Sequence, residues 1–434
     1  MAIWERNFEC CHRDELEQLQ LERLQSSLNR AYKNVSFYRH SFDQKKIVPE
    51  DIRNYSDFKQ LPFTTRQDLQ NNYPYGMFAV PLREVVRIHT TAETADTPTV
   101  IGYTRNDLKN WAGLIARFLT AAGVTDEDVI QVSFHYGLFT GAFGLHHGAE
   151  RIGASVIPAS SEQTDKQIRI MQDYRSTVLA TTPSYALILA ERIEALGIDP
   201  KTLMLKKGLL GAELWSEKTR REIEQRLCIE AFDNYGVSEL MGPGIAGECS
   251  EHAGMHIFED HFLPEIINPR TTEVLPPGST GELVLTTLTR EAFPLIRYRT
   301  GEVTSLDYSP CACGRTMVRM QRVTGRTDDT LVIKGVNVMP QYIEKVLMEI
   351  EGCEPRYQVV ARREHNRDSL EVRVEVSENV CFDEIKYQEL FRERVRTTLA
   401  HRLGLRVDVK LLERKTLEDE LKKSGKVLDM RGII

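Results

Sequence analysis

The 434-residue chain is long enough for more than one domain, and its 41% apolar and 27% charged residues are typical of a folded globular protein. A net charge of −7 with a pI near 6.0 argues against a general nucleic-acid binder. No apolar run approaches the roughly 18 residues that span a bilayer. The N-terminus lacks a signal-peptide pattern and the eight cysteines are unevenly spaced. We therefore expect a cytoplasmic protein with reduced thiols that binds neither nucleic acid nor membrane.

The first hundred residues predict a helix followed by a hairpin. Apolar residues recur at helical spacing over residues 14–35, which indicates an amphipathic helix. Short strand patterns at residues 85–89 and 100–103 enclose a polar loop, which is typical of a hairpin. Thr104, followed three residues later by Asp107, resembles a capping box and predicts a helix that runs to about residue 122.

Strand and helix patterns then alternate up to residue 232. Strand-like apolar runs occupy residues 128–134, 154–158, 178–182, 207–211 and 228–232. Helical patterns lie between them at residues 140–152, 164–174, 185–196 and 215–227. This alternation predicts an α/β domain with mainly parallel sheets covered by helices. Ligands bind such sheets beyond the carboxyl ends of the strands. The candidate ligand loops are residues 181–183, 211–213 and 233–239.

The third of these loops carries the most informative residues. We expect the chain to turn at residues 233–236, where Gly236 has no Cβ to block a ligand from the backbone. Ser238 and Glu239 follow, a hydroxyl and a carboxylate of the kind that hold Mg²⁺. The alternative is an ordinary loop without a ligand.

After residue 260 the pattern changes twice. Short strands with turns between them predict a small β unit at residues 265–269, 281–287 and 296–299. A turn at residues 325–329 places a domain boundary near Asp328. Beyond it the patterns predict a smaller α+β domain, with helices at residues 339–351 and 385–402, strands at residues 357–376 and 407–412, and a basic tail at residues 422–426.

Eight short motifs carry a resemblance that covers nearly the whole chain. In order they are residues 69–81 (LQNNYPYGMFAVP), 136–141 (YGLFTG), 182–185 (TPSY), 235–239 (YGVSE), 259–262 (EDHF), 296–301 (IRYRTG), 325–329 (GRTDD) and 334–337 (KGVN). Each alone is weak, but their order is specific. The chain resembles the phenylacetate–coenzyme A ligase-like branch of the adenylate-forming, or acyl-CoA synthetase, superfamily.

The resemblance implies an ATP-dependent acid–thiol ligase that works in two steps. An aryl or acyl carboxylate attacks the α-phosphate of ATP to give an acyl-adenylate, and the thiol of coenzyme A then displaces AMP. It further implies that residues 1–327 form the adenylate-forming domain. Residues 328–434 would form a mobile lid that rotates between the steps, with Asp328 as the hinge.

Site roles follow from the same resemblance. Adenine and ribose contacts are expected from Ala212, Glu213, Asp233, Asn234, Tyr235 and Gly236. Ser238 and Glu239 would lie beside the α-phosphate and Mg²⁺. Glu302 would bond the ribose hydroxyls, although the family pattern favours Asp there and the extra methylene shifts the carboxylate outward. Arg326 would also reach the nucleotide.

The remaining expected roles concern coenzyme A, the reacting phosphate and the acid. Gly335 would let pantetheine pass close to the backbone. Lys426 would neutralise the charge that builds on the α-phosphate during adenylation, and its alternative is a solvated tail lysine. Tyr136 and Phe139 are candidates for the acyl pocket, with plain core packing as the alternative. We thus expect Lys426, Glu239 and Arg326 to be the catalytic residues.

A second constellation has the residue types of a structural zinc site. Cys249, Cys311 and Cys313 supply three sulfur ligands, and such a site is tetrahedral with four. The resemblance favours His256 as the fourth ligand, because relatives with the CxCGR turn also carry a histidine in Gly-x-His. His252 is the second choice. The alternative is two unrelated loops of free thiols.

One segment departs from the family pattern. The phosphate loop usually reads Ser-Ser-Gly-Thr-Thr-Gly-Lys, whereas residues 91–97 here read TAETADT, without either glycine or the lysine. Two hypotheses therefore stay open: an acyl-coenzyme A ligase, or a nucleotide-binding protein of the same fold with weakened catalysis. The sequence names neither the acid nor the oligomeric state, and a homodimer remains an open alternative.

Overall fold

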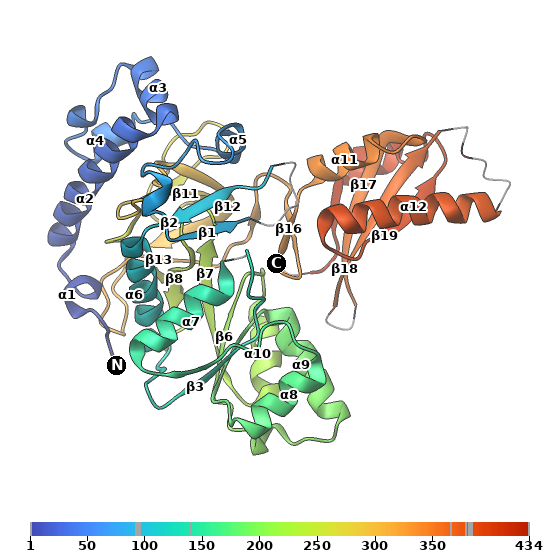
Figure 1. Cartoon of the computed structure of the whole chain (residues 1–434), viewed down its shortest axis with the longest axis horizontal. Helices are drawn as coiled ribbons and strands as arrows, with labels where there is room; N and C mark the ends of the chain where they lie inside the picture. The colour runs from blue at the N-terminus through green and yellow to red at the C-terminus, as the bar shows by residue number, and fades with distance from the viewer. Residues whose placement is uncertain are drawn as a thin grey trace. The chain divides into compact units, whose positions relative to one another are not determined.

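The computed structural model describes residues 2–91, 97–138, 140–364, 367–377, 380 and 385–432. The chain forms two compact units (Figure 1): the first contains most of the residues up to Thr327, and the second contains the residues from Asp328 onward together with the short segments Ala92–Pro98 and Glu213–Ser216. Each unit has its own apolar core. Two of the predicted features lie outside the described residues. They are residues 92–96, most of the phosphate loop that differs from the family pattern, and the predicted pocket residue Phe139.

The first unit begins with helices α1 (Arg6–Glu9), α2 (Arg13–Asn34), α3 (Ser36–Lys45), α4 (Tyr55–Phe58) and α5 (Arg66–Asn71). The predicted helix at residues 14–35 is confirmed as α2, which buries Leu16, Leu24 and Leu28 on its inner face. These side chains lie eight and four positions apart, a spacing that places them on the one face that an amphipathic helix presents to a core.

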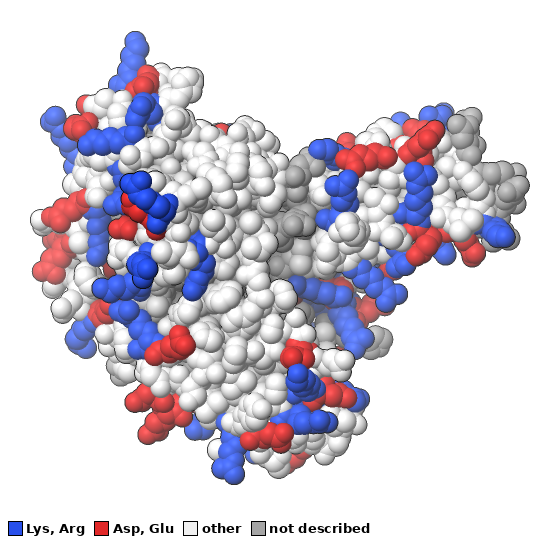
Figure 2. Space-filling model, in the orientation of Figure 1, with Lys and Arg blue, Asp and Glu red and all other residues white. Residues whose placement is uncertain are grey.

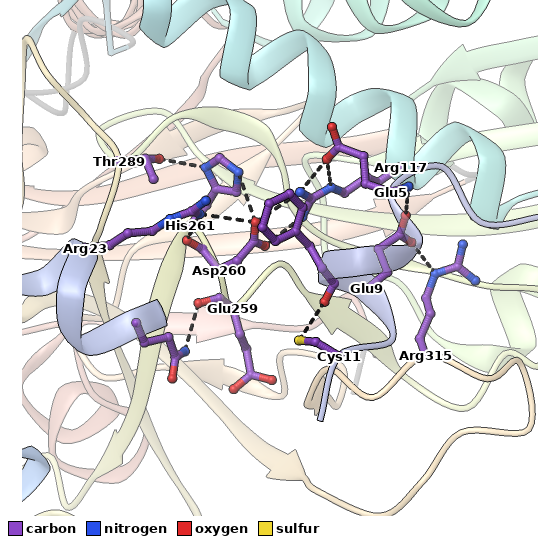
Figure 3. A network of polar contacts seen from close by, with 12 residues as sticks. Glu5, Glu9, Cys11, Arg23, Arg117, Glu259, Asp260, His261, Thr289 and Arg315 are labelled. Atoms are coloured by element: carbon purple, nitrogen blue, oxygen red, sulfur yellow. Dashed lines mark hydrogen bonds and ion pairs between the residues drawn. The ribbon is translucent and has the colours of Figure 1, made fainter. Parts of the chain in front are cut away.

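The polar groups around α1 tie it to the rest of the unit (Figure 3). Arg117 donates from Nε to Glu5 at 2.6 Å and from Nη1 to Asp260 at 2.7 Å. Arg315 donates to Glu9 at 2.6 Å, and both side chains of this pair are fully buried. The amino-terminal helix is therefore fixed by one fully buried ion pair, Arg315–Glu9, and by Glu5, whose side chain is 32% exposed.

The predicted hairpin and capping box are both confirmed. Strands β1 (Arg87–Thr90) and β2 (Val100–Tyr103) pair antiparallel. Helix α6 (Arg105–Ala121) follows, and Thr104 Oγ1 accepts from the Asp107 amide at 3.0 Å while Asp107 Oδ2 accepts from the Thr104 amide at 3.0 Å. Two amides at the start of the helix are thereby satisfied.

The predicted parallel sheet is confirmed. Its strands are β3 (Val129–Val132), β4 (Ser155–Ile157), β5 (Val178–Thr181), β6 (Lys207–Gly211) and β7 (Glu230–Val237), in the order β7-β6-β5-β3-β4. The helices between them are α7 (Gly141–Ile152), α8 (Thr164–Asp173), α9 (Pro183–Ala195) and α10 (Glu217–Leu227). Right-handed crossovers place α7 on the face that α6 covers and α8, α9 and α10 on the other. The strand order reverses between β3 and β5, which makes this edge a ligand-binding position.

Antiparallel strands extend this sheet beyond β7. They are β8 (Gly242–Glu248), β9 (Met255–Ile257), β13 (Arg319–Met320), β12 (Tyr298–Asp307), β11 (Thr280–Thr287) and β10 (Phe262–Ile267), with β14 (Gly325–Arg326) paired to β12. The predicted small β unit is thus joined to the parallel strands through β8, β9 and β13.

The expected turn at residues 233–236 is wrong. Strand β7 runs through to Val237, because β8 pairs with it antiparallel and supplies partners for its backbone. A Cβ at Gly236 would lie 2.3 Å from the Gly242 carbonyl oxygen. The close approach that requires glycine here is therefore that of the neighbouring strand.

The second unit contains the hairpin β15 (Leu331–Ile333) and β16 (Val336–Val338), helices α11 (Pro340–Met348) and α12 (Ile385–Leu403), and a sheet in the order β19-β18-β17-β20. Its strands are β17 (Cys353–Glu364), β18 (Arg367–Val376), β19 (Asp408–Leu412) and β20 (Val427–Asp429). The expected tail is wrong in part, because residues Glu418–Ser424 form helix α13 and the residues that follow pair with β17 as strand β20.

The surface of the described chain carries mixed charge. Figure 2 shows basic and acidic side chains interspersed on the visible face of the first unit, around a largely uncharged centre. Among the helices of the described residues, none combines the length and apolarity that crossing a membrane requires.

Candidate functional site

The carboxyl ends of β6 and β7 bring four of the expected nucleotide residues together. Gly211, the last residue of β6, lies opposite Asn234 in β7, and Ala212 follows with a left-handed backbone at φ 64°. Asp233 and Tyr235 flank Asn234 in the same strand, and all three side chains are buried. Because β6 and β7 are parallel, these residues share one edge of the sheet. Glu213 continues directly from Ala212 in the chain.

The backbone of this strand end is held by buried charge. The Asp233 amide donates to Glu248 at 2.7 Å, and both Nη2 contacts of Arg220 to the same carboxylate measure 2.7 Å. Asn234 Oδ1 accepts from the Gly244 amide at 3.2 Å. The strand that carries the expected nucleotide contacts is thus fixed before any ligand binds.

A second group joins Tyr235, Glu302 and Arg326. Glu302 lies directly opposite Arg326 in the pairing of β12 with β14, and their side chains form an ion pair at 3.0 Å. The Tyr235 hydroxyl donates to the other oxygen of Glu302. Burial, reinforced by the Glu302 charge, holds the pKa of Tyr235 well above its usual range, so the phenol keeps its proton. The Glu302 carboxylate is therefore oriented from two sides.

Ser238 and Glu239 follow β7 at the same edge. The Ser238 and Thr140 hydroxyl oxygens lie 3.0 Å apart, which ties this turn to the start of α7. Glu239 is buried and its Oε1 accepts from the Tyr298 hydroxyl at 3.4 Å and lies 3.5 Å from Nη2 of Arg66. A buried carboxylate with one long ion pair and a phenol contact can still accept a cation.

The sequence interpretation missed Arg66 and Thr140. Thr65 forms a capping box with Asp68 and so fixes the first turn of α5, which aims Arg66 at Glu239. The capping pattern signals that helix. Nothing in the sequence signals that the helix faces residue 239, which lies more than 170 positions away.

Tyr136, the expected pocket residue, follows β3 beside the point where the strand order reverses. Its side chain is half-buried, packs edge-on against Phe143 with ring centroids 5.2 Å apart, and its hydroxyl lies 3.0 Å from Nδ1 of His146. Burial raises the pKa of Tyr136. Tyr136 thus packs partly against the hydrophobic core and leaves part of its side chain exposed.

In the second unit, Gly335 and Lys426 lie on different elements. Lys334 and Gly335 form the two-residue turn between β15 and β16, with φ of 52° and 77°, so the hairpin itself requires a left-handed backbone at Gly335. Lys426 precedes β20, and its ammonium lies 2.7 Å from Glu344.

The described residues contain a compact Cys₃His group. The ligand atoms of Cys249, His256, Cys311 and Cys313 all lie within 4.8 Å of one another, and all four side chains are buried. Cys249 and Cys311 sulfurs are 3.8 Å apart, and Cys313 Sγ is 3.4 Å from His256 Nε2. Residues from three separate segments thus converge as a metal centre requires.

His252, the second choice, lies elsewhere. Its Nδ1 lies 3.0 Å from Arg220 Nη1, and its Nε2 lies 3.2 Å from Glu230 Oε1. By contrast, His256 Nδ1 lies 3.2 Å from the Met317 carbonyl oxygen, to which it can donate. That bond leaves the lone pair of Nε2 facing the cysteines, as expected for a ligating histidine.

Comparison with known proteins identifies the family. The family model of the AMP-binding enzyme C-terminal domain matches residues 335–431. A phenylacetate-coenzyme A ligase of Thermus thermophilus is 43% identical over 443 residues, which cover 99% of this chain and 100% of that protein. One of Pseudomonas putida is 50% identical over 364 residues, 84% of this chain and 82% of that protein.

The fold agrees with a solved relative. A crystal structure of 2-hydroxyisobutyryl-CoA ligase with 2-HIB-AMP and CoA superposes with a TM-score of 0.94 at 26% identity, covering 99% of this chain and 93% of that one. The match to the Thermus thermophilus protein extends over both units of this chain. The chain therefore belongs to the phenylacetate–coenzyme A ligase family of adenylate-forming enzymes.

Proposed function

We propose that the protein activates an aryl or acyl carboxylate with ATP and transfers it to coenzyme A, with phenylacetate as the first acid to test. The observation that carries this proposal is the 43% identity to a phenylacetate-coenzyme A ligase across 99% of the chain. A free carboxylate is a poor electrophile, and its mixed anhydride with AMP has a good leaving group. Two half-reactions at one site follow from that chemistry.

The residues at the ends of β6 and β7 would hold the nucleotide. Ala212, Glu213 and the backbone of residues 233–236 would line adenine and ribose. Glu302, oriented by Tyr235 and Arg326, would bond the ribose hydroxyls. Its two existing partners support this role, because an already oriented carboxylate loses little freedom when it binds a diol.

Glu239 and Ser238 would hold Mg²⁺ beside the α-phosphate, since the cation prefers carboxylate and hydroxyl oxygens. Mg²⁺ supplies charge neutralisation for the phosphates when bound. Arg326 would reach the nucleotide, and Tyr136 and Phe139 would shape the acyl pocket.

Residues 1–327 would then form the adenylate-forming domain, and residues 328–434 would act as the lid that carries Lys426 and Gly335. The match of residues 335–431 to the C-terminal domain of AMP-binding enzymes supports this division. Asp328, at the start of the second unit, is the proposed hinge.

The Cys₃His group would hold one structural zinc. Tetrahedral zinc with Zn–S near 2.3 Å and Zn–N near 2.0–2.1 Å places two sulfurs about 3.8 Å apart and sulfur about 3.6 Å from nitrogen. The corresponding separations here are 3.8 and 3.4 Å. With four protein ligands the ion would have no open position and would perform no chemistry.

The altered phosphate loop is the feature that supports the second hypothesis, weakened catalysis. Glu93 and Asp96 would repel the β- and γ-phosphates, while the strand-end contacts to adenosine would be unaffected. We therefore expect AMP to bind more tightly than ATP. Replacing Glu93→Gly, Asp96→Gly and Thr97→Lys together should raise ATP affinity and pyrophosphate exchange.

The deciding experiment is a pyrophosphate-release screen over aryl and short acyl acids, each with and without coenzyme A. Phenylacetate should release pyrophosphate and, with coenzyme A present, yield the thioester. If no acid in either class releases pyrophosphate, and calorimetry still detects AMP binding, the weakened-catalysis hypothesis replaces the ligase.

A further inference from the structure

The ammonium of Lys426 has a specific partner within its own unit. Its Nζ lies 2.7 Å from Oε2 of Glu344, on α11, and 5.0 Å from the centroid of the Tyr357 ring, on β17. The fully buried Tyr357 places its hydroxyl 3.2 Å from the same Glu344 oxygen and 2.8 Å from the Pro340 carbonyl. Lys426 therefore lies in a small cradle of one carboxylate and one aromatic face.

The backbone of Lys426 is fixed while its side chain reaches solvent. The Lys426 carbonyl accepts from the Val359 amide at 2.8 Å as β20 begins beside β17. Gln358 Nε2 holds the preceding segment through the Gly425 carbonyl at 3.1 Å. The Lys426 and Glu344 side chains are 50% and 35% exposed. Only the tip of the lysine is thus free to exchange partners.

We propose that Glu344 is a positioning residue, which holds Lys426 when it is not engaged with the nucleotide and must release it for adenylation. This inference rests on the proposed role of Lys426 at the α-phosphate. A carboxylate oxygen and a phosphate oxygen offer the ammonium the same kind of charge-assisted bond, so they compete for it. The Tyr357 hydroxyl orients the Glu344 carboxylate, and the Tyr357 ring orients the Lys426 ammonium.

The strength of the contact fits a releasable partner. A solvent-exposed lysine–carboxylate pair shifts an equilibrium by a factor of only about two to five, and salt screens it. Glu344 therefore slows adenylation modestly. Thioester formation is unaffected by Glu344, because no carboxylate attacks the α-phosphate in that step and the Lys426 charge is not needed.

The test compares four variants in separate half-reaction assays. In Glu344→Gln the amide oxygen still accepts from Tyr357, but the charge on the lysine partner is gone. We expect pyrophosphate exchange to rise about twofold to fivefold at low salt, the gain to vanish at high salt, and thioester formation from preformed acyl-adenylate to stay unchanged. Tyr357→Phe is the matched control, because it removes the hydroxyl contact and keeps the charge pair.

Two further variants, Lys426→Ala and the double variant Lys426→Ala with Glu344→Gln, distinguish a failure of the Glu344 inference from a failure of the proposed role of Lys426. The gain from Glu344→Gln should disappear in the Lys426→Ala background. If the gain persists there, if exchange does not rise, or if both half-reactions change equally, Glu344 does not position Lys426. If Lys426→Ala alone leaves exchange unaltered, the proposed role of Lys426 fails and this inference fails with it. Absence of any thioester from the parent would instead contradict the ligase function.

Discussion

Two ion pairs, one from each unit, differ in their access to water. In the first unit, Arg117 and Asp260 are 1% and 0% exposed and form a two-bond pair, with Nη1 and Nη2 at 2.7 and 3.0 Å from the carboxylate oxygens (Figure 3). In the second unit, Lys426 and Glu344 form a one-bond pair at similar length but with 50% and 35% exposure. Distance alone does not separate these pairs.

Burial decides what each pair can do. Breaking a buried pair leaves a charge without water or partner, which costs several kcal/mol, so such pairs define fixed structure. An exposed pair exchanges its partner for water at little cost, so it suits a residue that must move between contacts. The Cys₃His group is anchored by a pair of the first kind, because the Arg315 amide donates to Cys313 Sγ at 3.4 Å while the Arg315 guanidinium pairs with buried Glu9.

The largest expected effect comes from opening the metal cluster. We expect purified protein to contain about one zinc per chain, and Cys311→Ser to lose it and to lower the free energy of unfolding of the first unit by more than about 5 kcal/mol. Metal analysis and thermal unfolding measure both. The exposed Cys228→Ser is the matched control and should change neither. Protein purified without chelator that contains no zinc would contradict this prediction.

The next effect tests the buried pair itself. Arg117→Met keeps the apolar bulk but leaves Asp260 to the partly exposed Arg23, 3.2 Å away. We expect a loss of about 3 kcal/mol in the free energy of unfolding. Arg192→Met breaks the exposed pair with Asp165, 42% and 55% exposed, and should change the free energy of unfolding much less than Arg117→Met does. Equal losses would mean that burial does not decide the strength of these pairs.

Substitution of Lys426, in the exposed pair, should show the opposite pattern: a small effect on thermal stability and a large effect on the rate of adenylation. Lys426→Ala should slow pyrophosphate exchange by about 100-fold, because a positioned charge acts on the developing transition state. AMP affinity and thermal stability should change little. Lys410→Ala, an exposed lysine on β19 of the same unit, provides the charge-matched control. An unaltered exchange rate would remove Lys426 from the reaction.

A smaller effect follows from His261, which lies beside the Arg117–Asp260 pair with Nε2 3.3 Å from Asp260. Burial lowers the pKa of His261 from 6.5 to about 3, although Asp260 acts to raise it. The folded state thus binds fewer protons than the unfolded state between these values. The contribution of His261 to the free energy of unfolding is therefore complete above pH 6.5. It decreases as the pH falls toward 3, by about 2 kcal/mol between pH 7 and pH 5.

Chemical denaturation at pH 7 and pH 5 measures this dependence. In His261→Gln, which can keep a bond to Thr289, 2.7 Å from Nδ1 in the parent, the loss on acidification should be smaller by about 2 kcal/mol. The same pH dependence in parent and variant would show that His261 does not titrate between these states.

Local rules predicted the elements whose signals lie within a few residues. The helix at residues 14–35 follows from apolar periodicity, the start of α6 from Thr104 and Asp107, and the parallel strands from the alternation of apolar runs with helices. The candidate metal ligands could be selected because cysteine and histidine are chemically distinctive, and the resemblance favoured His256 as the fourth. Their meeting point was not predictable from spacing, since about sixty residues separate Cys249 from Cys311.

Strands β8 and β9 escaped prediction for a physical reason. The sequence of β8, Gly242–Glu248, contains three glycines and no alternation of apolar and polar residues, so its strand conformation depends on pairing with β7. The same pairing extends β7 through residues 233–237, where a turn was expected. Likewise β20 forms beside β17, in a segment whose own residues indicate only a charged tail.

The sequence by itself determined the α/β class and the alternation of strands and helices along the chain, because these depend on local periodicity. It also determined the family and the identities of the candidate ligands, because these depend on residue chemistry. Only the tertiary structure decided that His256 rather than His252 joins the three cysteines, that Arg66 faces Glu239, and that Lys426 pairs with Glu344. Each of those contacts joins segments that are distant in sequence or chooses between chemically equal candidates, and only the packing of whole elements can make that choice.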